Sequence, residues 1–534
     1  MKSISLLLCL AALTACERGS VPLYDNLGSY HRAITTSSER AQAYFDQGMR
    51  LTWAFNHAEA IRAFREAARL DPECAMCFWG IALAYGPNIN IPMDSAGEQE
   101  AFAAIQRAIQ LRANASELER ALIDALARRY GETPLANRPA RDSAWAEAMR
   151  LVLERWPDDN DAGVLFADAM MNLRPWNYWM PDGRPFPGTG VLVAALERVI
   201  ARDSTHPGAC HLYIHAVEKV QPERAVPCAE RLASLMPGAG HLVHMPAHIY
   251  FRVGRYADAV AANEHASHAD SSYIEGQRPG GVYPMFYTPH NHHFRAAAAM
   301  MEGRYQAALA AARETARLAP LENVRAVPPL ELYVPVPLYV MARFGRWSEI
   351  LREPAPPAEL LFTTGVWYYA RALAYAATGH YDSARIAADS LVVIADDYPA
   401  EATIGLNSGR SLLHIAMHAL EGELAARAAR NDEAIRHLQQ AITIEDQLTY
   451  DEPPPWYYPV RHSLGAVLLT AGRAREAEAV YLEDLRRYPE NGWSLVGLRE
   501  ALRVQGRSAD AAAVDTRFRR AWARADTPIS ASRL

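Results

Sequence analysis

The sequence predicts an all-α fold, a solenoid of antiparallel helix pairs. Residues 41–72 place small and large apolar residues at helical spacing and end in a proline. A Gly-Arg or Gly-His turn then recurs along the chain, which indicates repeated units of one kind. Helical periodicity with short Gly, Pro or Asp breaks fills most of the remainder, and no stretch alternates polar and apolar residues as a strand would.

The first element, MKSISLLLCLAALTAC at residues 1–16, has the features of a bacterial secretory signal. Its apolar run, 4–13, is shorter than the roughly 18 residues that a membrane span requires. The last four residues resemble the lipobox of bacterial lipoproteins. This resemblance implies cleavage before Cys16 and attachment of lipid to that cysteine. An ordinary signal peptide with a chance cysteine is the alternative.

The resemblance to lipoproteins implies a lipid-anchored protein of the bacterial cell envelope. Glu17 stands directly after the cysteine where aspartate would favour the inner membrane, so we expect an outer-membrane protein that faces the periplasm. No later apolar run reaches the length of a span, and the lipid anchor is the only membrane contact predicted. A net charge of -7 without a Lys/Arg block argues against nucleic acid as a partner.

The repeat unit is clearest in residues 41–72. Small residues at two positions let antiparallel helices approach, large apolar residues fill the space between them, and a proline stops the second helix. At positions 4, 8, 11, 20, 24, 27 and 32 of a 34-residue unit stand Tyr44, Gly48, Leu51, Ala60, Phe64, Ala67 and Pro72. The pattern resembles the tetratricopeptide repeat (TPR), which implies a right-handed superhelix with a ligand-binding concave groove.

Further units are marked by turns between their two helices. These turns are GRYADA at 254, GRYQAA at 303, GRWSEI at 345, GHYDSA at 379, GRAREA at 472 and GRSADA at 506. Phrases such as HPGACHLYIHAVE and GAGHLVHMPAHIYFRVGRY are similar to a broad group of bacterial TPR lipoproteins. The similarity covers about residues 40–515 and implies the fold, but no activity.

The repeat register predicts how the chain is organised. About eight to ten helix pairs are expected at this period. The expected segments are a linker at 17–38, an N-terminal TPR array at 39–325, a C-terminal TPR array at 326–525 and a disordered tail at 526–534.

Four stretches interrupt the regular spacing, at 86–97, 174–190, 271–289 and 450–459. Ordinary linkers are polar, whereas these stretches are rich in Trp, Tyr, Phe and Pro, and we therefore expect loops that pack onto the solenoid. They either pack without a function of their own or form a lid over a site.

Histidines are concentrated in one segment. Eleven of the 18 lie between residues 206 and 293, where an even distribution would place about three. The repeat register assigns positions 5, 9 and 12 of one first helix to His211, His215 and Glu218. It assigns positions 2, 5 and 9 of the next to His241, His244 and His248, and positions 2 and 5 of a third to His290 and His293.

These positions favour a shared metal site. By resemblance to TPR proteins, positions 2, 5, 9 and 12 line the concave groove, and helical geometry alone places each set on one helix face. Neighbouring helices lie about 8 to 10 Å apart, so imidazoles from both sides can reach one zinc, copper, iron or nickel ion. The candidate ligands are His211, His215, His244 and His248 first, then His241, His290 and His293.

Other roles for these residues stay open. Glu218 is expected as a further ligand or as the general base of a catalytic site. The histidines either form one or two metal centres or hydrogen-bond one another and nearby aromatic residues, or they bind an anionic ligand. Disulfides are allowed in the periplasm among Cys74, Cys77, Cys210 and Cys228.

Two functional hypotheses follow. The first is a lipid-anchored scaffold whose concave groove binds a protein, a peptide or a small molecule, with a transition-metal site among its histidines. The second is a metal-dependent enzyme, a hydrolase or an oxidoreductase, with aromatic loops as a lid. Common hydrolase, nucleotide and dinucleotide motifs (GxSxG, HExxH, the P-loop and GxGxxG) do not occur in the sequence.

Overall fold

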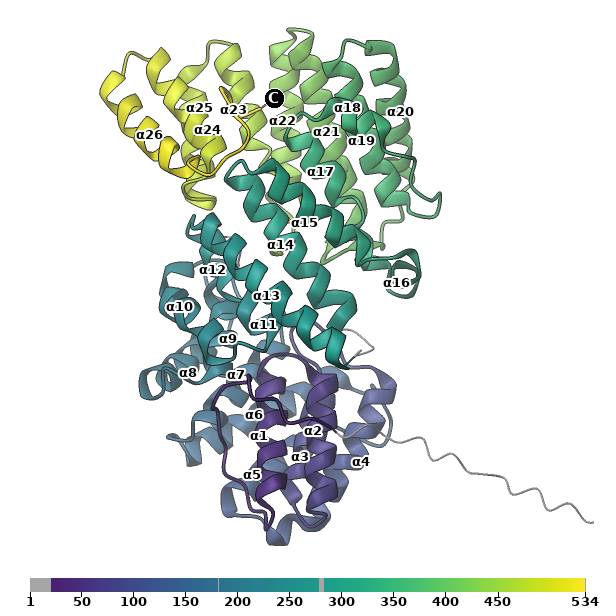
Figure 1. Cartoon of the computed structure of the whole chain (residues 1–534), viewed down its shortest axis with the longest axis vertical. Helices are drawn as coiled ribbons and strands as arrows, with labels where there is room; N and C mark the ends of the chain where they lie inside the picture. Colours follow the sequence, from purple (N-terminus) through teal and green to yellow (C-terminus); the bar gives the residue numbers. More distant parts are fainter. Residues whose placement is uncertain (1–20, 181, 278–282, 534) are drawn as a thin grey trace, which may run out of the picture.

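The computed structural model describes residues 21–180, 182–277 and 283–533. The predicted signal segment, 1–16, and its Cys16 lie outside the described residues. Over the described residues the chain is a TPR-like solenoid of 26 α-helices, labelled α1 to α26. Figure 1 shows the helices stacked along the long axis of the molecule, with the first helices at one end and the last at the other.

The N-terminal array contains seven helix pairs. Each pair packs together before the chain proceeds to the next one. The pairs are α1 (Glu39–Trp53) with α2 (His57–Leu70), α3 (Ala75–Tyr85) with α4 (Ser95–Leu111), α5 (Glu117–Leu126) with α6 (Arg138–Arg155), α7 (Asn160–Asn172) with α8 (Thr189–Arg202), α9 (Pro207–Val217) with α10 (Val226–Leu235), α11 (Gly240–His244) and α12 (Pro246–Arg252) with α13 (Tyr256–Gln277), and α14 (Thr288–Met301) with α15 (Tyr305–Arg317).

The C-terminal array adds five pairs after the short helix α16 (Leu321–Ala326). These pairs are α17 (Val336–Arg343) with α18 (Trp347–Arg352), α19 (Leu361–Ala377) with α20 (Tyr381–Asp397), α21 (Gly409–Arg427) with α22 (Asn431–Glu445), α23 (Arg461–Thr470) with α24 (Ala474–Arg487), and α25 (Gly492–Val504) with α26 (Ser508–Ala521). The described residues thus hold twelve helix pairs, more than the expected eight to ten.

The remaining regular elements are short. The 3-10 helices are η1 (Arg112–Asn114), η2 (Pro222–Ala225) and η4 (Pro328–Tyr333), and η3 (Tyr283–Tyr287) is a π-helix. A two-residue antiparallel hairpin, β1 (Thr403–Ile404) and β2 (Asn407–Ser408), was not expected from the sequence. Among the described residues, none of the helices has the length and apolar character needed to cross a membrane.

Small residues allow the close helix packing that the repeat pattern predicts. A Cβ atom added to Gly48 on α1 would lie 2.5 Å from the ring of Phe64, and one on Gly80 of α3 would lie 2.4 Å from it. Near the C-terminus the ring of Tyr481 crowds Gly465 and Gly497 in the same way, at 2.4 and 2.1 Å. An aromatic residue at position 24 therefore packs between two glycines, one in its own unit and one in the next.

The recurrent Gly-Arg and Gly-His turns have one backbone conformation. All six glycines have a positive φ, between 64° and 82°. This left-handed conformation is unfavourable for residues that have a Cβ atom. Glycine adopts it without that penalty, and it is therefore common where a helix ends. The turn motif thus identified helix boundaries correctly at Gly254, Gly303, Gly345, Gly379, Gly472 and Gly506.

The two ends of the described chain are more ordered than the sequence suggested. Within the expected linker, Arg32 is buried and pairs with Asp161 on α7 at 2.6 Å. The expected disordered tail packs on the last helices, where Ser532 is fully buried and donates a hydrogen bond to the carbonyl of His462. Asp526 accepts hydrogen bonds from the first backbone N–H groups of α15. These hydrogen bonds and ion pairs thus order two segments whose composition alone predicts irregular coil.

Candidate metal centre

Four helices of the N-terminal array direct the predicted histidines into one interior space. The histidines on α9, α11 and α12 are between 0 and 3% exposed, and those on α14 are half-buried. The structure thus encloses the rings on α9, α11 and α12. The side chains come from α9 (His211, His215), α11 (His241, His244), α12 (His248) and α14 (His290, His293).

Pro246 interrupts the stretch that was expected to form one helix over these residues. Proline has no backbone N–H to continue the helical hydrogen bonds, and the stretch divides into α11 and α12. His244 and His248 nevertheless face each other, with their Nε2 atoms 2.9 Å apart. Residues at i and i+4 thus remain on one face despite the break between the two helices.

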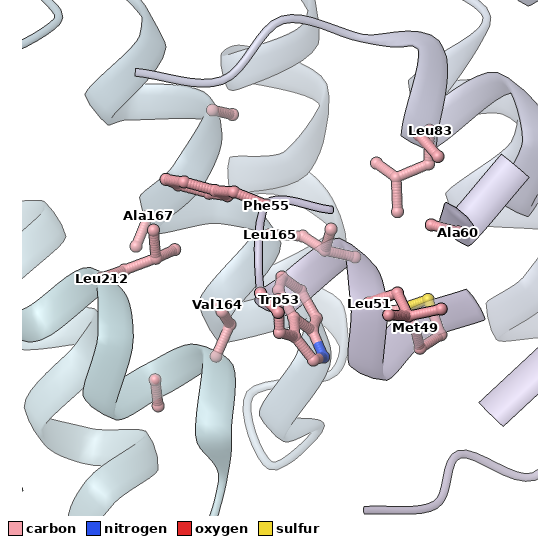
Figure 2. Close-up of a cluster of buried hydrophobic side chains, with 14 of the residues drawn as sticks. Met49, Leu51, Trp53, Phe55, Ala60, Leu83, Val164, Leu165, Ala167 and Leu212 are labelled. Atoms are coloured by element: carbon pink, nitrogen blue, oxygen red, sulfur yellow. The ribbon is translucent and has the colours of Figure 1, made fainter. Parts of the chain in front are cut away.

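The end of α1 supports the first histidine helix. Figure 2 shows Trp53 and Phe55 where α1 ends, beside Leu212 of α9. A Cβ added to Gly208 would lie 2.6 Å from the Trp53 ring, so only glycine lets α9 approach this closely. The Phe55 ring packs against His211 with the centroids 4.4 Å apart. Phe55 has a φ of 56°, a conformation that costs about 1 to 2 kcal/mol in a residue with a side chain.

Four histidines have their Nδ1 atoms bound to oxygen acceptors. Backbone carbonyl, side-chain amide and carboxylate oxygens can only accept a hydrogen bond. The Nδ1 atom of each ring must therefore carry the proton. The Asn263 side chain is oriented by donating its own N–H to Ala259 at 2.8 Å. The pairs are His211 with the Trp53 carbonyl (2.6 Å), His244 with Asn263 Oδ1 (2.6 Å), His248 with Glu218 Oε2 (2.6 Å) and His215 with Glu218 Oε1 (3.1 Å).

These hydrogen bonds determine what the other ring nitrogens offer. A neutral imidazole with its proton on Nδ1 has a lone pair on Nε2. Between His244 and His248, two such lone pairs face each other at 2.9 Å and repel unless a proton or a metal ion lies between them. The Nε2 atoms of His211 and His241 lie 3.2 Å apart. His215 Nε2 is buried without a hydrogen-bond partner among the described residues.

Burial keeps three of the imidazoles neutral, whereas contacts with two histidines keep Glu218 ionised. Burial lowers the pKa of His211, His241 and His244 well below the usual 6.5, and the neighbouring histidines lower it further. Burial alone raises the pKa of Glu218, but His248 and His215 outweigh it and hold that pKa at about 2. A set of neutral nitrogen donors around one buried anion matches the needs of a divalent transition metal.

The ligand atoms form two histidine trios. The first trio is His211, His215 and His241, and the second trio is His244, His248 and His290. Within each trio the ligand atoms lie within 4.8 Å of one another. Two nitrogens bound to one tetrahedral ion at about 2.0 to 2.1 Å lie about 3.3 to 3.4 Å apart. The His211 to His241 separation of 3.2 Å is close to this value.

Two predicted site residues, Glu218 and His293, lie outside both histidine trios. Glu218 caps α9, and each of its carboxylate oxygens accepts an N–H from a histidine, which orients His215 and His248. It is also close enough to form a third ligand group with these two rings. His293 belongs to neither trio, and its ring packs against Tyr333 at 5.7 Å. Sequence reasoning missed Phe55, just after the end of α1, and Asn263 on α13, which both support the rings.

The four aromatic and proline-rich loops meet over the histidines. A cavity of about 450 Å³ adjoins His215, His241 and His248, and every loop contributes to its wall. Hydrogen bonds join three loops, since Trp176 donates to Asn90 Oδ1 at 3.1 Å and Asn90 donates to the Tyr287 hydroxyl at 3.2 Å. The loops therefore cover the site, as the lid alternative requires.

The four cysteines of the described chain are paired. Cys74 and Cys77 form a disulfide at the start of α3, where the Cys74 sulfur also accepts the Cys77 N–H. Cys210 and Cys228 form a disulfide that joins α9 to α10. The second disulfide lies next to His211 in the chain and anchors α9, which carries His211 and His215 of the first trio.

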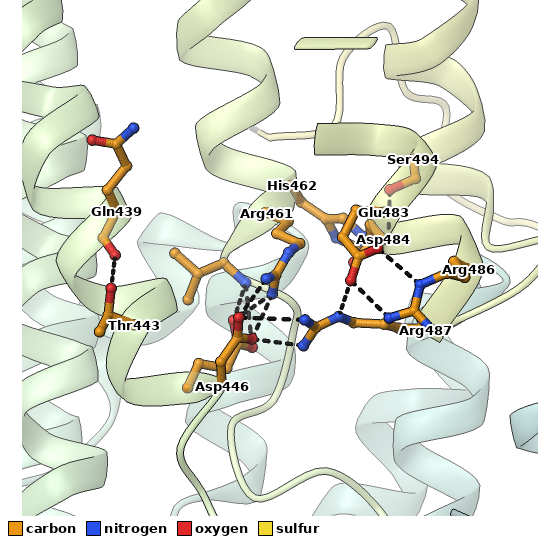
Figure 3. Close-up of polar contacts among 12 residues, drawn as sticks. Gln439, Thr443, Asp446, Arg461, His462, Glu483, Asp484, Arg486, Arg487 and Ser494 are labelled. Atoms are coloured by element: carbon orange, nitrogen blue, oxygen red, sulfur yellow. Dashed lines mark hydrogen bonds and ion pairs between the residues drawn. The ribbon is translucent and has the colours of Figure 1, made fainter. Parts of the chain in front are cut away.

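A buried histidine of the C-terminal array, His462, has a structural role. Figure 3 shows His462, Asp484 and Ser494 among the contacts around α23 and α24. Asp484 Oδ2 accepts from His462 at 3.0 Å, from Ser494 at 2.6 Å and from Asn491 at 3.0 Å. The Ser494 hydroxyl donates its proton to the carboxylate and not to the histidine. The serine is therefore not activated as a nucleophile. This network joins α23, α24 and α25.

No protein-family model matches this sequence, and no curated protein matches it. Among solved structures, an IFIT1 monomeric mutant with Gppp-AAAA is 14% identical, at 92% coverage of each chain and a TM-score of 0.34. The human IFIT1 dimer with m7Gppp-AAAA is also 14% identical, with 91% of this chain and 90% of that one covered and a TM-score of 0.32. Yeast Tom70 is 10% identical, with coverages of 90% and 91% and a TM-score of 0.30. These likenesses are too distant to indicate a ligand or partner.

Proposed function

We propose that this chain is a metal-dependent protein that binds a transition-metal ion through the histidine trios and a small organic molecule in the adjoining cavity. The observation that carries the proposal is the pattern of Nδ1 hydrogen bonds. Four rings donate Nδ1–H to fixed oxygens and leave Nε2 free. Metal-binding histidines are held in this way by carbonyl and carboxylate acceptors in metalloproteins.

The burial of the site favours this proposal over recognition of a protein partner by the histidines. A protein or peptide in an open groove contacts exposed side chains, whereas His211, His244 and His248 are at most 1% exposed. A cavity of about 450 Å³ has the size of a site for a small organic molecule. The helical scaffold thus serves to hold a closed site, and any partner protein would bind elsewhere on its surface.

The ion would supply Lewis-acid or redox chemistry in a space that the aromatic loops shield from bulk water. This chain's own residues hold the ligands in their tautomers, through Glu218 for two rings and through Asn263 for a third. The choice between a hydrolase and an oxidoreductase depends on the identity of the metal, which imidazole ligands alone do not select.

We also propose that the protein is lipid-anchored through Cys16 in the bacterial envelope and faces the periplasm. The two disulfides of the described chain support this location, because disulfides persist in oxidising compartments. Replacing Cys16 by alanine should prevent incorporation of labelled palmitate and release the protein from membranes. Membrane association and labelling that remain unchanged in this variant would contradict lipid anchoring.

The metal proposal is tested by removing one ligand from each trio. In a double variant, His215→Ala and His248→Ala, the purified protein should lose its transition metal and keep its helical circular dichroism signal. A matched control replaces His414 and His418, an i, i+4 pair on α21 outside the trios, and should retain the metal. Metal retained in the first double variant would refute the ligand assignment.

A further inference from the structure

The cavity beside the histidines contains a buried acceptor that the metal proposal does not use. Glu452, on the loop 450–459, lines the cavity and is 2% exposed. Its Oε1 accepts a hydrogen bond from Tyr450 at 3.1 Å and lies 3.7 Å from Arg252. Its Oε2 has no hydrogen-bond partner among the described residues. A buried acceptor in this state gains stability when a ligand supplies a donor.

A tyrosine hydroxyl in the cavity wall is also unpartnered. Tyr339 lies on α17, lines the cavity and is 5% exposed. Its hydroxyl has no hydrogen-bond partner within the described part of the chain. The Tyr339 ring stacks on Tyr457 with the centroids 4.5 Å apart and an interplanar angle of 11°. This side of the cavity, from the C-terminal array, therefore offers aromatic faces together with two free polar groups.

The rest of the wall selects against anions. Among the described residues that line the cavity there is no lysine or arginine, and most are apolar or aromatic. Asp451 lines the cavity together with Glu452. Burial raises the pKa of each of these carboxyl groups to about 7. An anionic ligand would meet two carboxyl groups, and Arg252, the cation near Glu452, does not line the cavity, whereas a donor group would stabilise the ionised form of Glu452.

We propose that the cavity binds an uncharged or cationic molecule with a ring-containing apolar body, whose hydroxyl or amino group donates a hydrogen bond to Glu452 Oε2. The inference rests on the small-molecule cavity of the proposed function and names its ligand class. It does not depend on metal, because Glu452 belongs to none of the ligand groups of the trios.

Three probes with one ring and different head groups test the inference: 2-phenylethanol, 2-phenylethylamine and phenylacetate. Each is titrated calorimetrically into the mature full-length protein, once as purified and once after treatment with a chelator. We expect the alcohol and the amine to bind at least about ten-fold more tightly than phenylacetate to the chelator-treated protein, in which no metal ion can bind the carboxylate of the probe.

One variant and its control test whether the preference over phenylacetate depends on the Glu452 carboxylate. In Glu452→Gln, the preference for the amine over phenylacetate should fall at least about ten-fold, because the carboxylate acceptor is lost. The matched control is Glu302→Gln, at a buried carboxylate that pairs with Arg304 at 2.9 Å outside the cavity. This control should keep the preference of the unaltered protein.

The inference is overturned if phenylacetate binds the chelator-treated protein as tightly as the other probes do, if none of the three binds, or if Glu452→Gln keeps the full preference. Its failure is distinct from that of the metal proposal. Metal-free protein that still prefers the amine and alcohol would support the ligand class and refute the metal centre. A protein that contains metal as purified, but lacks that preference after chelator treatment, would support the metal centre and refute the ligand class.

Discussion

His244 and His248 face each other across the break at Pro246 with their Nε2 atoms 2.9 Å apart, while the Nδ1 proton of each ring is bound to an oxygen. Neither ring can turn its proton toward the other without losing a buried hydrogen bond. A positive charge between the two nitrogens removes their repulsion, and the surrounding histidines favour a metal ion in that place.

Replacing Glu218 by glutamine should weaken metal binding about 10- to 100-fold. The carboxylate accepts an N–H from His215 and another from His248, whereas an amide has one acceptor oxygen and one donor group. One ring therefore loses its orientation. The affinity is measured by competition with a chromogenic chelator.

A buried carboxylate outside the site provides the control for this variant. Asp484 accepts a hydrogen bond from His462 at 3.0 Å. Asp484→Asn should lower the free energy of unfolding without changing metal affinity. If both variants weaken metal binding equally, Glu218 acts on stability alone and its orienting role is wrong.

Without metal, the protein should lose stability as the pH falls below about 6.5. Burial lowers the pKa of His211, His241 and His244 below that value in the folded state, so the unfolded chain binds protons that the folded chain does not. The free energy of unfolding therefore decreases with falling pH in this window. Glu218, whose pKa is held at about 2, adds a further loss between about pH 4.5 and pH 2.

Urea unfolding of chelator-treated protein at about pH 7.5 and about pH 5 measures this dependence. His244→Asn should reduce it, because one buried ring is removed. His380→Asn, at an exposed ring, should leave it unchanged. Equal midpoints at the two pH values in the unaltered protein would show that these histidines do not resist protonation.

Two turn glycines separate backbone strain from side-chain crowding. Gly379 has a φ of 82° and open space around it, so Gly379→Ala should cost about 1 to 2 kcal/mol of stability. At Gly303, with a φ of 76°, an added Cβ would lie 2.2 Å from the Trp522 ring. Gly303→Ala should cost about 1 to 3 kcal/mol more than Gly379→Ala. Thermal unfolding compares the two, and equal losses would contradict the packing of α26 against this turn.

Replacing Asp526 by alanine should lower the free energy of unfolding by about 0.5 to 2 kcal/mol. Its carboxylate accepts hydrogen bonds from the backbone N–H groups of Tyr305 (2.7 Å) and Gln306 (2.9 Å), and it thus caps α15 from the C-terminal tail. Asp510, an exposed residue in the first turn of α26, is the control, and its replacement should change stability less. An unaffected Asp526→Ala variant would indicate that the tail does not dock in solution.

Local rules predicted the repeat fold from the sequence. The packing of Phe64 between Gly48 and Gly80 depends only on the sizes of these residues. The positive φ of Gly254 depends only on the backbone freedom of glycine. The order of the tail was not predictable, because Asp526 and Ser532 hold it through hydrogen bonds to helices far away in the sequence.

The site was predictable in part. The repeat register grouped the histidines because residues at equivalent positions of successive helices lie next to one another. Two features depended on contacts between distant segments. The carbonyl that orients His211 belongs to Trp53, and the loop that encloses the cavity beside His248 comes from residues 450–459. Neither contact leaves a pattern in the sequence near the histidines.

Elemental analysis of the purified mature protein tests the central claim most directly. The two trios predict about one or more equivalents of zinc, copper, iron or nickel per chain, lost in the double variant His215→Ala and His248→Ala. Less than about a tenth of an equivalent of any transition metal, with no uptake on titration, would contradict the metal centre.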